Sequence, residues 1–161
     1  MSNISIRKII ITDKSFFARW WRDEELIKLT SGVIKPISDQ EVNEYFSSML
    51  KQNNDHHFII TADSDVIGHI SLSKRQYNWY EIQIAIGEKQ YWGKGYGTEA
   101  INLVINKAKT INIIKLFLLV RPTNERAIKA YEKCGFKYIK EIAQPNNKYL
   151  PTLLRMEHII Y

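Results

Sequence analysis

The chain of 161 residues has little that would place it outside the cytoplasm. Cys134 is its only cysteine, so no disulfide can form within the chain and nothing requires an oxidising compartment. No apolar run approaches the ~20 residues that a membrane-spanning helix needs, and the first residues lack the apolar core of a signal peptide. We therefore expect a cytoplasmic protein with no membrane association.

The sequence also lacks the patterns of metal sites and nucleic-acid readers. The histidines and the cysteine form no H-x-x-x-H or C-x-x-C pair, so we expect no metal. The net charge is +6, from 23 basic and 17 acidic residues, yet the basic residues form no run of five and no known reading module. We expect no nucleic-acid partner, although the positive charge alone keeps that alternative open.

Length and apolar content indicate one domain over residues 1–161, since 45% of the residues are apolar and no linker or repeat divides the chain. The expected fold is mixed α/β, with a central twisted sheet of about seven strands flanked by about four helices. Helical spacing predicts helices after residues 13, 38, 97 and 124. Alternating and apolar runs predict strands near residues 4–11, 57–62, 66–73, 79–86, 115–120, 136–142 and 153–160.

Glycine is scarce, yet Gly93, Gly95 and Gly97 stand at alternate positions between a predicted strand and a predicted helix. Glycines let the backbone approach an anion closely, and the helix that follows offers unpaired N–H groups and the positive end of its dipole. The spacing excludes two common phosphate loops. Tyr96 stands where the Walker loop needs Ser or Thr, and Thr98 stands where the dinucleotide loop needs its third glycine.

A pattern that does fit is Q/R-x-x-G-x-G/A, read as Gln90, Gly93 and Gly95, which resembles the acetyl-CoA loop of the GCN5-related N-acetyltransferases (GNAT). A second segment, from Asn124 to Phe136, is similar to the family pattern N-x-x-A-x-x-x-Y-x-K-x-G-F at every stated position. The resemblance covers nearly the whole chain and is closest in style to the RimL-like branch. It implies the GNAT fold and an acetyl-CoA-dependent N-acetyltransferase that acts on a primary amine.

The resemblance implies a set of contacts to acetyl-CoA. The main chain at Ile84 and Ile86 would bind the pantetheine arm, and Asn124 would hydrogen-bond the same arm. The other contacts would come from the glycine loop, the start of its helix and the helix of the second motif: Gln90, Tyr91, Trp92, Gly93, Lys94, Gly95, Gly97, Thr98, Ala127 and Tyr131.

The reaction needs few protein groups. A thiolate leaves when the amine attacks the thioester, and a thiol pKa of about 8.5 means that a proton donor helps its departure. The resemblance places that role on Tyr131. Glu81 lies on the polar face of the strand predicted at residues 79–86 and could accept the ammonium proton through water, although a solvated or salt-bridged carboxylate explains it equally. Trp21, Trp79 and Glu81 are candidate substrate contacts.

The sequence does not choose the acceptor. A protein N-terminus, a polyamine, an aminoglycoside or another amino sugar fits the resemblance, and we expect its contacts in the first two helices and in residues 144–148. The alternative function is a non-catalytic module of the same fold that senses acyl-CoA or binds a partner. A homodimer formed through the last strands is also left open.

Overall fold

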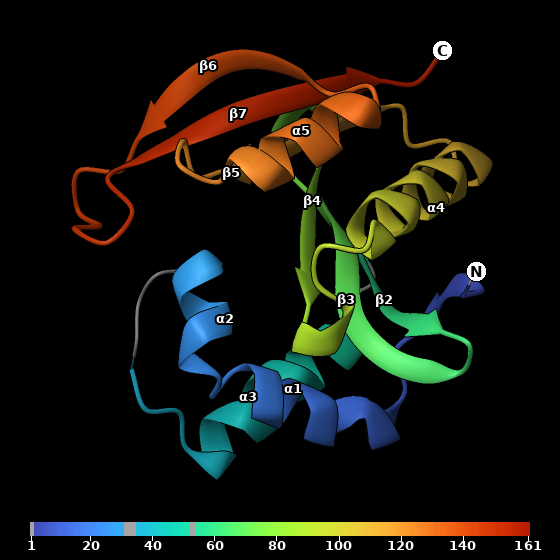
Figure 1. Ribbon diagram of the computed structural model, residues 1–161, viewed down its shortest axis with the longest axis vertical. Helices are drawn as coiled ribbons and strands as arrows, with labels where there is room; N and C mark the ends of the chain where they lie inside the picture. The colour runs from blue at the N-terminus through green and yellow to red at the C-terminus, as the bar shows by residue number, and fades with distance from the viewer. Residues whose placement is uncertain (1, 31–34, 52–53) are drawn as a thin grey trace.

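The computed structural model describes residues 2–30, 35–51 and 54–161, and its framework is one seven-stranded sheet in the order β1-β2-β3-β4-β5-β7-β6 (Figure 1). The mixed α/β sheet predicted from the sequence is therefore confirmed. The strands are β1 (Ile4–Lys8), β2 (Asp55–Ala62), β3 (Asp65–Lys74), β4 (Trp79–Ile86), β5 (Lys115–Val120), β6 (Lys137–Ala143) and β7 (Thr152–Ile159). The α-helices of the described ranges are α1 (Lys14–Trp20), α2 (Glu24–Leu29), α3 (Asp39–Lys51), α4 (Tyr96–Thr110) and α5 (Glu125–Lys133).

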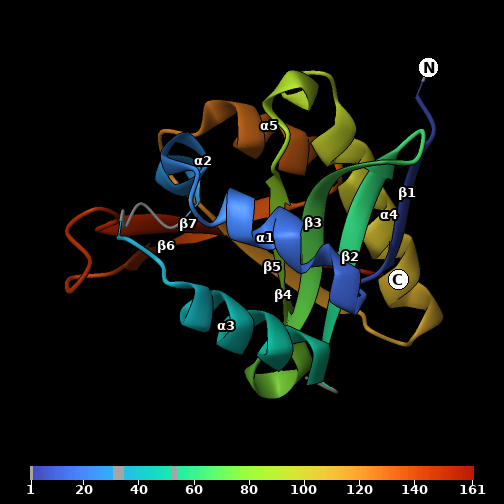
Figure 2. The same ribbon diagram turned by 90° about the horizontal axis from the view of Figure 1, so that it is seen from below.

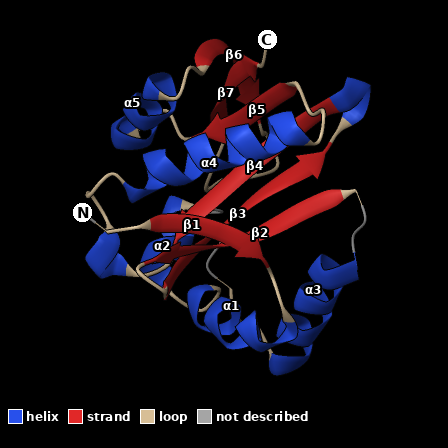
Figure 3. Cartoon of the chain, turned by 90° about the vertical axis from the view of Figure 1, so that its right-hand side faces the viewer, coloured by secondary structure: helices blue, strands red, loops and turns tan. Residues whose placement is uncertain are grey.

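The helices cover both faces of the sheet: α4 and α5 lie on one face, and α1, α2 and α3 lie on the other (Figure 3). Strand β2 shows the reason. Phe58 and Ile60 pack in the core beneath α4, whereas Ile59 packs on the opposite face with Phe17 and Phe46. Successive side chains of a strand point to opposite faces, so an unbroken apolar run needs a cover on both. No helix in the described part of the chain is long and apolar enough to cross a membrane.

The helix predicted after residue 13 is α1, and the structure adds a short helix, α2, directly after it. The chain leaves the helical path at Trp21, because Asp23 begins a new helix. Its carboxylate accepts hydrogen bonds from the backbone N–H groups of Glu25 and Leu26. An N-cap of this kind satisfies N–H groups that a helix start otherwise leaves unpaired. The result is the short helix α2, which the sequence analysis did not predict.

The first predicted strand is also shorter than expected and ends at Lys8. Beyond it, the buried carboxylate of Asp13 accepts a hydrogen bond from the backbone N–H of Ile10 at 2.8 Å and pairs with Arg7 at 2.8 Å. A buried carboxylate needs such partners. These contacts draw the chain back into a 3-10 turn (Ile11–Asp13) in place of the strand.

The sheet opens between its two central parallel strands, β4 and β5. Their register pairs Trp79 with Lys115 and Glu81 with Phe117. No later residue of β4 is paired with β5 in the described chain, although β4 continues for five further residues, 82–86. The two strands therefore diverge toward their carboxyl ends. Figure 2 shows the sheet from the side of α1 and α3.

The open edge of β4 turns backbone groups toward the gap beside β5. Gly87 donates its N–H to the carbonyl of Ile67 on the β3 side at 2.8 Å. In an antiparallel ladder, alternate residues bond to the same neighbour, so the odd-numbered residues of β4 bond to β3. The even-numbered residues Ile84 and Ile86 consequently turn their N–H and C=O groups toward the gap beside β5. These are the two positions predicted to bind the pantetheine arm.

We predict that Gly87→Ala destabilises the fold. A Cβ at Gly87 would lie 2.2 Å from the indole ring of Trp20, which is only 4% exposed and donates its Nε1–H to Glu88. Overpacking of this kind costs about 1–3 kcal/mol, and urea unfolding measures it. At Gly97 a Cβ would meet nothing within 4 Å, so Gly97→Ala is the control. Equal losses of stability in the two variants would contradict this account.

Candidate active site

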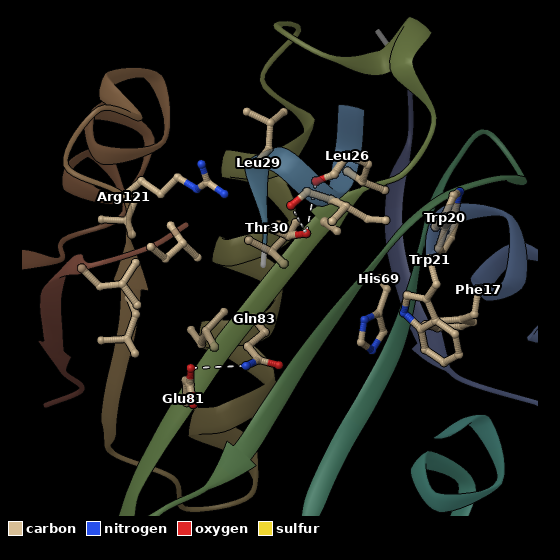
Figure 4. Close-up of a pocket in the computed structure, with 18 of the residues that line it drawn as sticks. Phe17, Trp20, Trp21, Leu26, Leu29, Thr30, His69, Glu81, Gln83 and Arg121 are labelled. Atoms are coloured by element: carbon tan, nitrogen blue, oxygen red, sulfur yellow. Dashed lines mark hydrogen bonds between the residues drawn. The ribbon is translucent and has the colours of Figure 1, made fainter. Parts of the chain in front are cut away.

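A cavity of about 870 Å³ lies where β4 and β5 diverge. Figure 4 shows β4 crossing it, with Arg121 on one wall and His69 on the opposite side. Apolar side chains from α1, α2 and β7 form part of the lining. The polar and charged lining residues are Thr30, Lys35, Glu41, Tyr45, His57, His69, Glu81, Gln83, Arg121, Asn124, Tyr131 and Gln144.

The glycine loop leads into α4 and leaves its N-terminus without a side-chain cap. Gly95 is the N-cap residue, with a φ of 86° in the left-handed region that glycine tolerates. The N–H of Glu99 bonds to the carbonyl of Gly95 at 3.1 Å, so the N–H groups of residues 96–98 precede the first bond within the helix. A Cβ at Gly95 or Gly97 would meet nothing within 4 Å. The backbone of the loop is therefore open to a ligand.

Three other helices of the chain are closed by their own side chains. Asp23 caps α2, Asn124 caps α5, and Ser38 accepts from the N–H of Glu41 at the start of α3, as the sequence predicted. The uncapped start of α4 thus keeps several N–H donors and the positive end of a 15-residue helix for an exogenous anion. These features fit the diphosphate of CoA.

The predicted loop residues come together at this helix end, and they are Gln90, Gly93, Lys94, Gly95, Gly97 and Thr98. The sequence analysis did not predict one cationic side chain at this helix end, that of Arg126. Arg126 places Nη1 3.6 Å from the position that a Cβ of Gly93 would take. The side chain of Arg126 is exposed and has no ion pair among the described residues. Its place inside the second motif, two residues after Asn124, was the available signal.

Tyr91 and Trp92 hold the glycine loop in place through hydrogen bonds of their side chains. The Tyr91 hydroxyl donates to Asp65 at 2.9 Å, and Trp92 Nε1 donates to the carbonyl of Ile86 at 2.6 Å. Both backbone N–H groups bond to carbonyls of the preceding turn. The donors of these two residues are therefore used to hold the loop and the end of β4. A direct contact between either residue and acetyl-CoA stays a prediction.

The second motif brings Asn124 and Tyr131 to the cavity. Asn124 Oδ1 accepts the N–H of Ala127 at 3.2 Å, and its amide NH2 group makes no bond within the described residues. Ala127 packs against the core. Burial, together with the neighbouring Cys134 thiol, raises the pKa of Tyr131 to about 12. The phenol therefore keeps its proton at neutral pH and is available as a donor.

Glu81, the predicted base, lines the cavity within an ion pair. Its Oε2 lies 2.7 Å from Nη2 of Arg75, and Gln83 Nε2 donates to its Oε1 at 3.3 Å (Figure 4). The salt-bridged carboxylate was one of the two interpretations of the sequence, and the ion pair is present. The role of Glu81 as a general base stays a prediction.

The two tryptophans predicted as substrate contacts lie in different places. Trp21 lines the cavity, with its ring edge-to-face against Tyr45 at 6.1 Å between centroids. Trp79 is not among the described residues that line the cavity. It is the first residue of β4, at the end of the strand away from the gap. There it packs against Phe117 and beneath the guanidinium of Arg155, 5.0 Å from the ring centroid.

A histidine pair in the cavity was missed in the sequence. His57 on β2 and His69 on β3 stack with ring centroids 5.3 Å apart, and Nδ1 of the first lies 3.1 Å from Nε2 of the second. Burial lowers the pKa of both rings, so the pair is uncharged at neutral pH. Side chains alternate between the two faces of a strand, and this alternation along the two predicted strands was the available signal that the histidines share a face. Among the described residues, no group of three His, Cys, Asp or Glu is placed to hold a metal.

Comparison with known proteins gives the family of the chain. A family model described as an acetyltransferase (GNAT) domain matches residues 3–137, and the chain belongs to this family. The spermidine N(1)-acetyltransferase of Escherichia coli K12 is 30% identical over 105 residues, which are 63% of this chain and 56% of that protein. The chain spans between 29% and 59% of the length of the first curated relatives that it matches.

Solved structures share the fold. A spermidine N-acetyltransferase from Vibrio cholerae, in complex with CoA and spermine, has a TM-score of 0.85 at 22% identity and covers 97% of this chain and 95% of its own. The aminoglycoside acetyltransferase AAC(6')-Ib in complex with coenzyme A has a TM-score of 0.81 at 18% identity, with 98% and 95% covered. The GNAT fold predicted from the two motifs is thereby confirmed.

We predict that Gly97→Ala weakens acetyl-CoA binding while the fold stays intact. The added methyl group would stand in the open space beside the first N–H groups of α4, where phosphates are expected. Alanine is about 1 kcal/mol better than glycine inside a helix, so the melting temperature should not fall. Calorimetry should show a Kd raised about tenfold or more. The control is Asn106→Ala, an exposed position on the same helix, and an unchanged Kd in Gly97→Ala would contradict the prediction.

We also predict a loss of stability below about pH 6.5 that depends on His69. Burial lowers the pKa of His69 to about 3 in the folded protein, whereas the unfolded chain titrates near 6.5. Between these two pH values the unfolded state binds more protons than the folded state. The free energy of unfolding is therefore not reduced by His69 above pH 6.5, and it decreases as the pH falls below that value. One such group lowers the free energy of unfolding by about 2 kcal/mol when the pH falls from 7 to 5.

Urea unfolding at both pH values measures this effect. In His69→Gln, the decrease in unfolding free energy from pH 7 to pH 5 should be smaller than in the wild type by about that amount. The same decrease in both proteins would show that His69 is not the group responsible.

Proposed function

We propose that the protein is an acetyl-CoA-dependent N-acetyltransferase that moves the acetyl group directly to a primary amine. The observation that carries the proposal is the meeting of the two motifs at one gap in the sheet. The glycine loop opens α4, Tyr131 lies on α5, and the two helices contact each other above diverging strands. Family membership and the fold of the neighbours support the same activity.

In the proposed complex, acetyl-CoA lies along the gap. The N–H groups at the start of α4 bind its diphosphate, with Arg126 beside them. The N–H groups of Ile84 and Ile86 and the carbonyl of Ile84 bind the pantetheine arm, and the amide NH2 of Asn124 adds a donor, whereas the carbonyl of Ile86 stays bonded to Trp92. One of the β4 N–H groups polarises the acetyl carbonyl and stabilises the oxyanion that forms on it.

Transfer then needs one bond to form and one to break. The neutral amine nitrogen attacks the thioester carbon, a C–N bond forms, and the C–S bond breaks with its electron pair on sulfur. Tyr131 donates its proton to the departing sulfur, and bulk water returns that proton. The nitrogen releases its own proton, for which Glu81 is the proposed acceptor through water. Gln83 and Arg75 hold that carboxylate in place.

The acceptor is drawn from the amines named above. Similarity to spermidine N-acetyltransferases favours a polyamine on family grounds, and the structural neighbours add aminoglycosides. Fold and family do not by themselves fix a substrate, which depends on the side chains of the cavity. The RimL-like branch, a homodimer and a cytoplasmic location also stay proposals. The free, buried thiol of Cys134 is consistent with the last of these.

The test is thiol release from acetyl-CoA, followed with a chromogenic disulfide reagent in the presence of polyamines, aminoglycosides, amino sugars and short peptides. Release that depends on the amine supports the proposed activity. Calorimetric binding of acetyl-CoA with no release from any amine would favour the non-catalytic acyl-CoA sensor. Absence of acetyl-CoA binding would contradict both functions.

We predict that Tyr131→Phe lowers kcat by about a hundredfold, the contribution of a typical general acid, and changes the Kd of acetyl-CoA by less than about twofold. The phenyl ring keeps the packing against Phe136 and removes the proton donor. Tyr138→Phe, at an exposed position of β6, is the matched control. Unchanged turnover in Tyr131→Phe would remove this residue from the mechanism.

A further inference from the structure

Arg121 is a charged side chain of the cavity for which the described chain provides no partner. It directly follows β5, and Figure 4 shows its guanidinium reaching from that wall into the cavity. Its Nε and Nη2 atoms are shielded from solvent and make no hydrogen bond within the described residues. A shielded cation without a counter-ion is costly, so its presence in a cavity points to a ligand that supplies one.

The other arginines of the chain are either exposed or paired with a carboxylate. Arg126 is exposed beside the glycine loop, where the phosphates of CoA are expected. Burial lowers the pKa of Arg121, whereas carboxylate partners raise the pKa of Arg7 and Arg19. An ion pair with Asp or Glu is formed by each of Arg7, Arg19, Arg22, Arg75 and Arg155.

The other charges of the described cavity wall are already balanced. Glu81 pairs with Arg75 at 2.7 Å, and Glu41 pairs with Lys35 at 3.8 Å. The two histidines are uncharged at neutral pH. The described wall therefore carries one uncompensated positive charge, on Arg121, and no uncompensated negative charge. A polyamine or aminoglycoside would bring further positive charge to it.

We propose that Arg121 binds an oxyanion, a carboxylate or a phosphate, that belongs to the acceptor amine itself. This inference rests on the proposed N-acetyltransferase function. Nε and Nη2 form one edge of the guanidinium, and that edge donates two parallel N–H bonds to a carboxylate or phosphate. Nε and Nη2, the atoms of this edge, are the two that are shielded and have no partner in the part of the chain that the structure describes.

An amide on the wall of the same cavity fits the same ligand. Gln144, on the loop after β6, also lines the cavity, and its Oε1 is shielded and accepts no hydrogen bond from the described residues. It would accept an N–H or O–H of the acceptor, while Arg121 holds the anion. The acceptor class is therefore an amine that carries its own anion, either an amino acid or peptide with a free carboxylate or an amino sugar phosphate.

The experiment compares matched amines in the thiol-release assay. Glucosamine 6-phosphate is paired with glucosamine, glycylglycine with glycylglycinamide, and spermidine is the polycationic reference. The wild type should show a kcat/KM about tenfold or more higher for the anionic member of at least one pair, the size of a charge-assisted hydrogen bond. The pair that responds distinguishes a phosphate from a carboxylate. In R121Q the ratio within that pair should fall to about one.

R126Q is the matched control, an arginine-to-glutamine change at the cofactor loop. It should raise the KM for acetyl-CoA and keep the wild-type preference between the amines. R121Q removes an unpaired charge and is expected to fold, which circular dichroism checks. The proposal is overturned if spermidine or the neutral amines react faster in the wild type, or if R121Q keeps the preference. It is also overturned if R121Q changes only the KM for acetyl-CoA, as R126Q does.

A binding measurement separates this proposal from the proposed function. The CoA-saturated protein is titrated with inorganic phosphate and, separately, with acetate, so no transfer is required. Binding of one anion by the wild type and R126Q, about tenfold weaker in R121Q, supports the role of Arg121 even if no amine is acetylated. Equal binding by all three proteins, or by none, overturns it.

Discussion

The ladder of hydrogen bonds between β4 and β5 ends at residue 81 of β4, and the rest of the site depends on that interruption. Backbone N–H and C=O groups in a protein interior require partners, so a strand edge left open between two covered faces needs a ligand or water. The N–H groups of Ile84 and Ile86 and the carbonyl of Ile84 lie on such an edge, while the carbonyl of Ile86 accepts a hydrogen bond from Trp92. The cavity lies where the two strands diverge, and the glycine loop follows the end of β4.

The site has two separate regions of positive charge. At the start of α4, an uncapped helix end is joined by the exposed side chains of Lys94 and Arg126. In the cavity, Nε and Nη2 of Arg121 are shielded from solvent and have no hydrogen-bond partner among the described residues. The first region suits the phosphates of CoA, because solvent and several N–H donors share the charge. The second suits a single, well-placed oxyanion, because the described part of the cavity wall offers Arg121 no counter-ion.

The two motifs lie in the cofactor half of the site, although the family model matches residues 3–137 and so includes α1, α2, β2 and β3 as well. These elements and the loop after β6 line the other side of the cavity, where we propose that the acceptor amine binds. There the carboxylates are neutralised by Arg75 and Lys35, and the histidine pair is uncharged. On a shared fold, the side chains that line the site determine which substrate is accepted.

The sequence by itself determined the strand Trp79–Ile86, the glycine loop and the helix of the second motif, because each is a local pattern of alternation, glycine spacing or helical period. It also predicted the capping box at Ser38 and Glu41. It missed the separate helix α2, which depends on the capping geometry of Asp23.

Only the tertiary structure decided the rest. The contact between His57 and His69, the ion pair that holds Glu81 and the isolation of Arg121 join elements that are distant in the chain, or follow from how neighbouring strands are placed. Whether a charged side chain has a partner is a property of three-dimensional surroundings. Two arginines five residues apart in the sequence, Arg121 and Arg126, therefore end in different environments, one shielded in the cavity and one exposed at the cofactor loop.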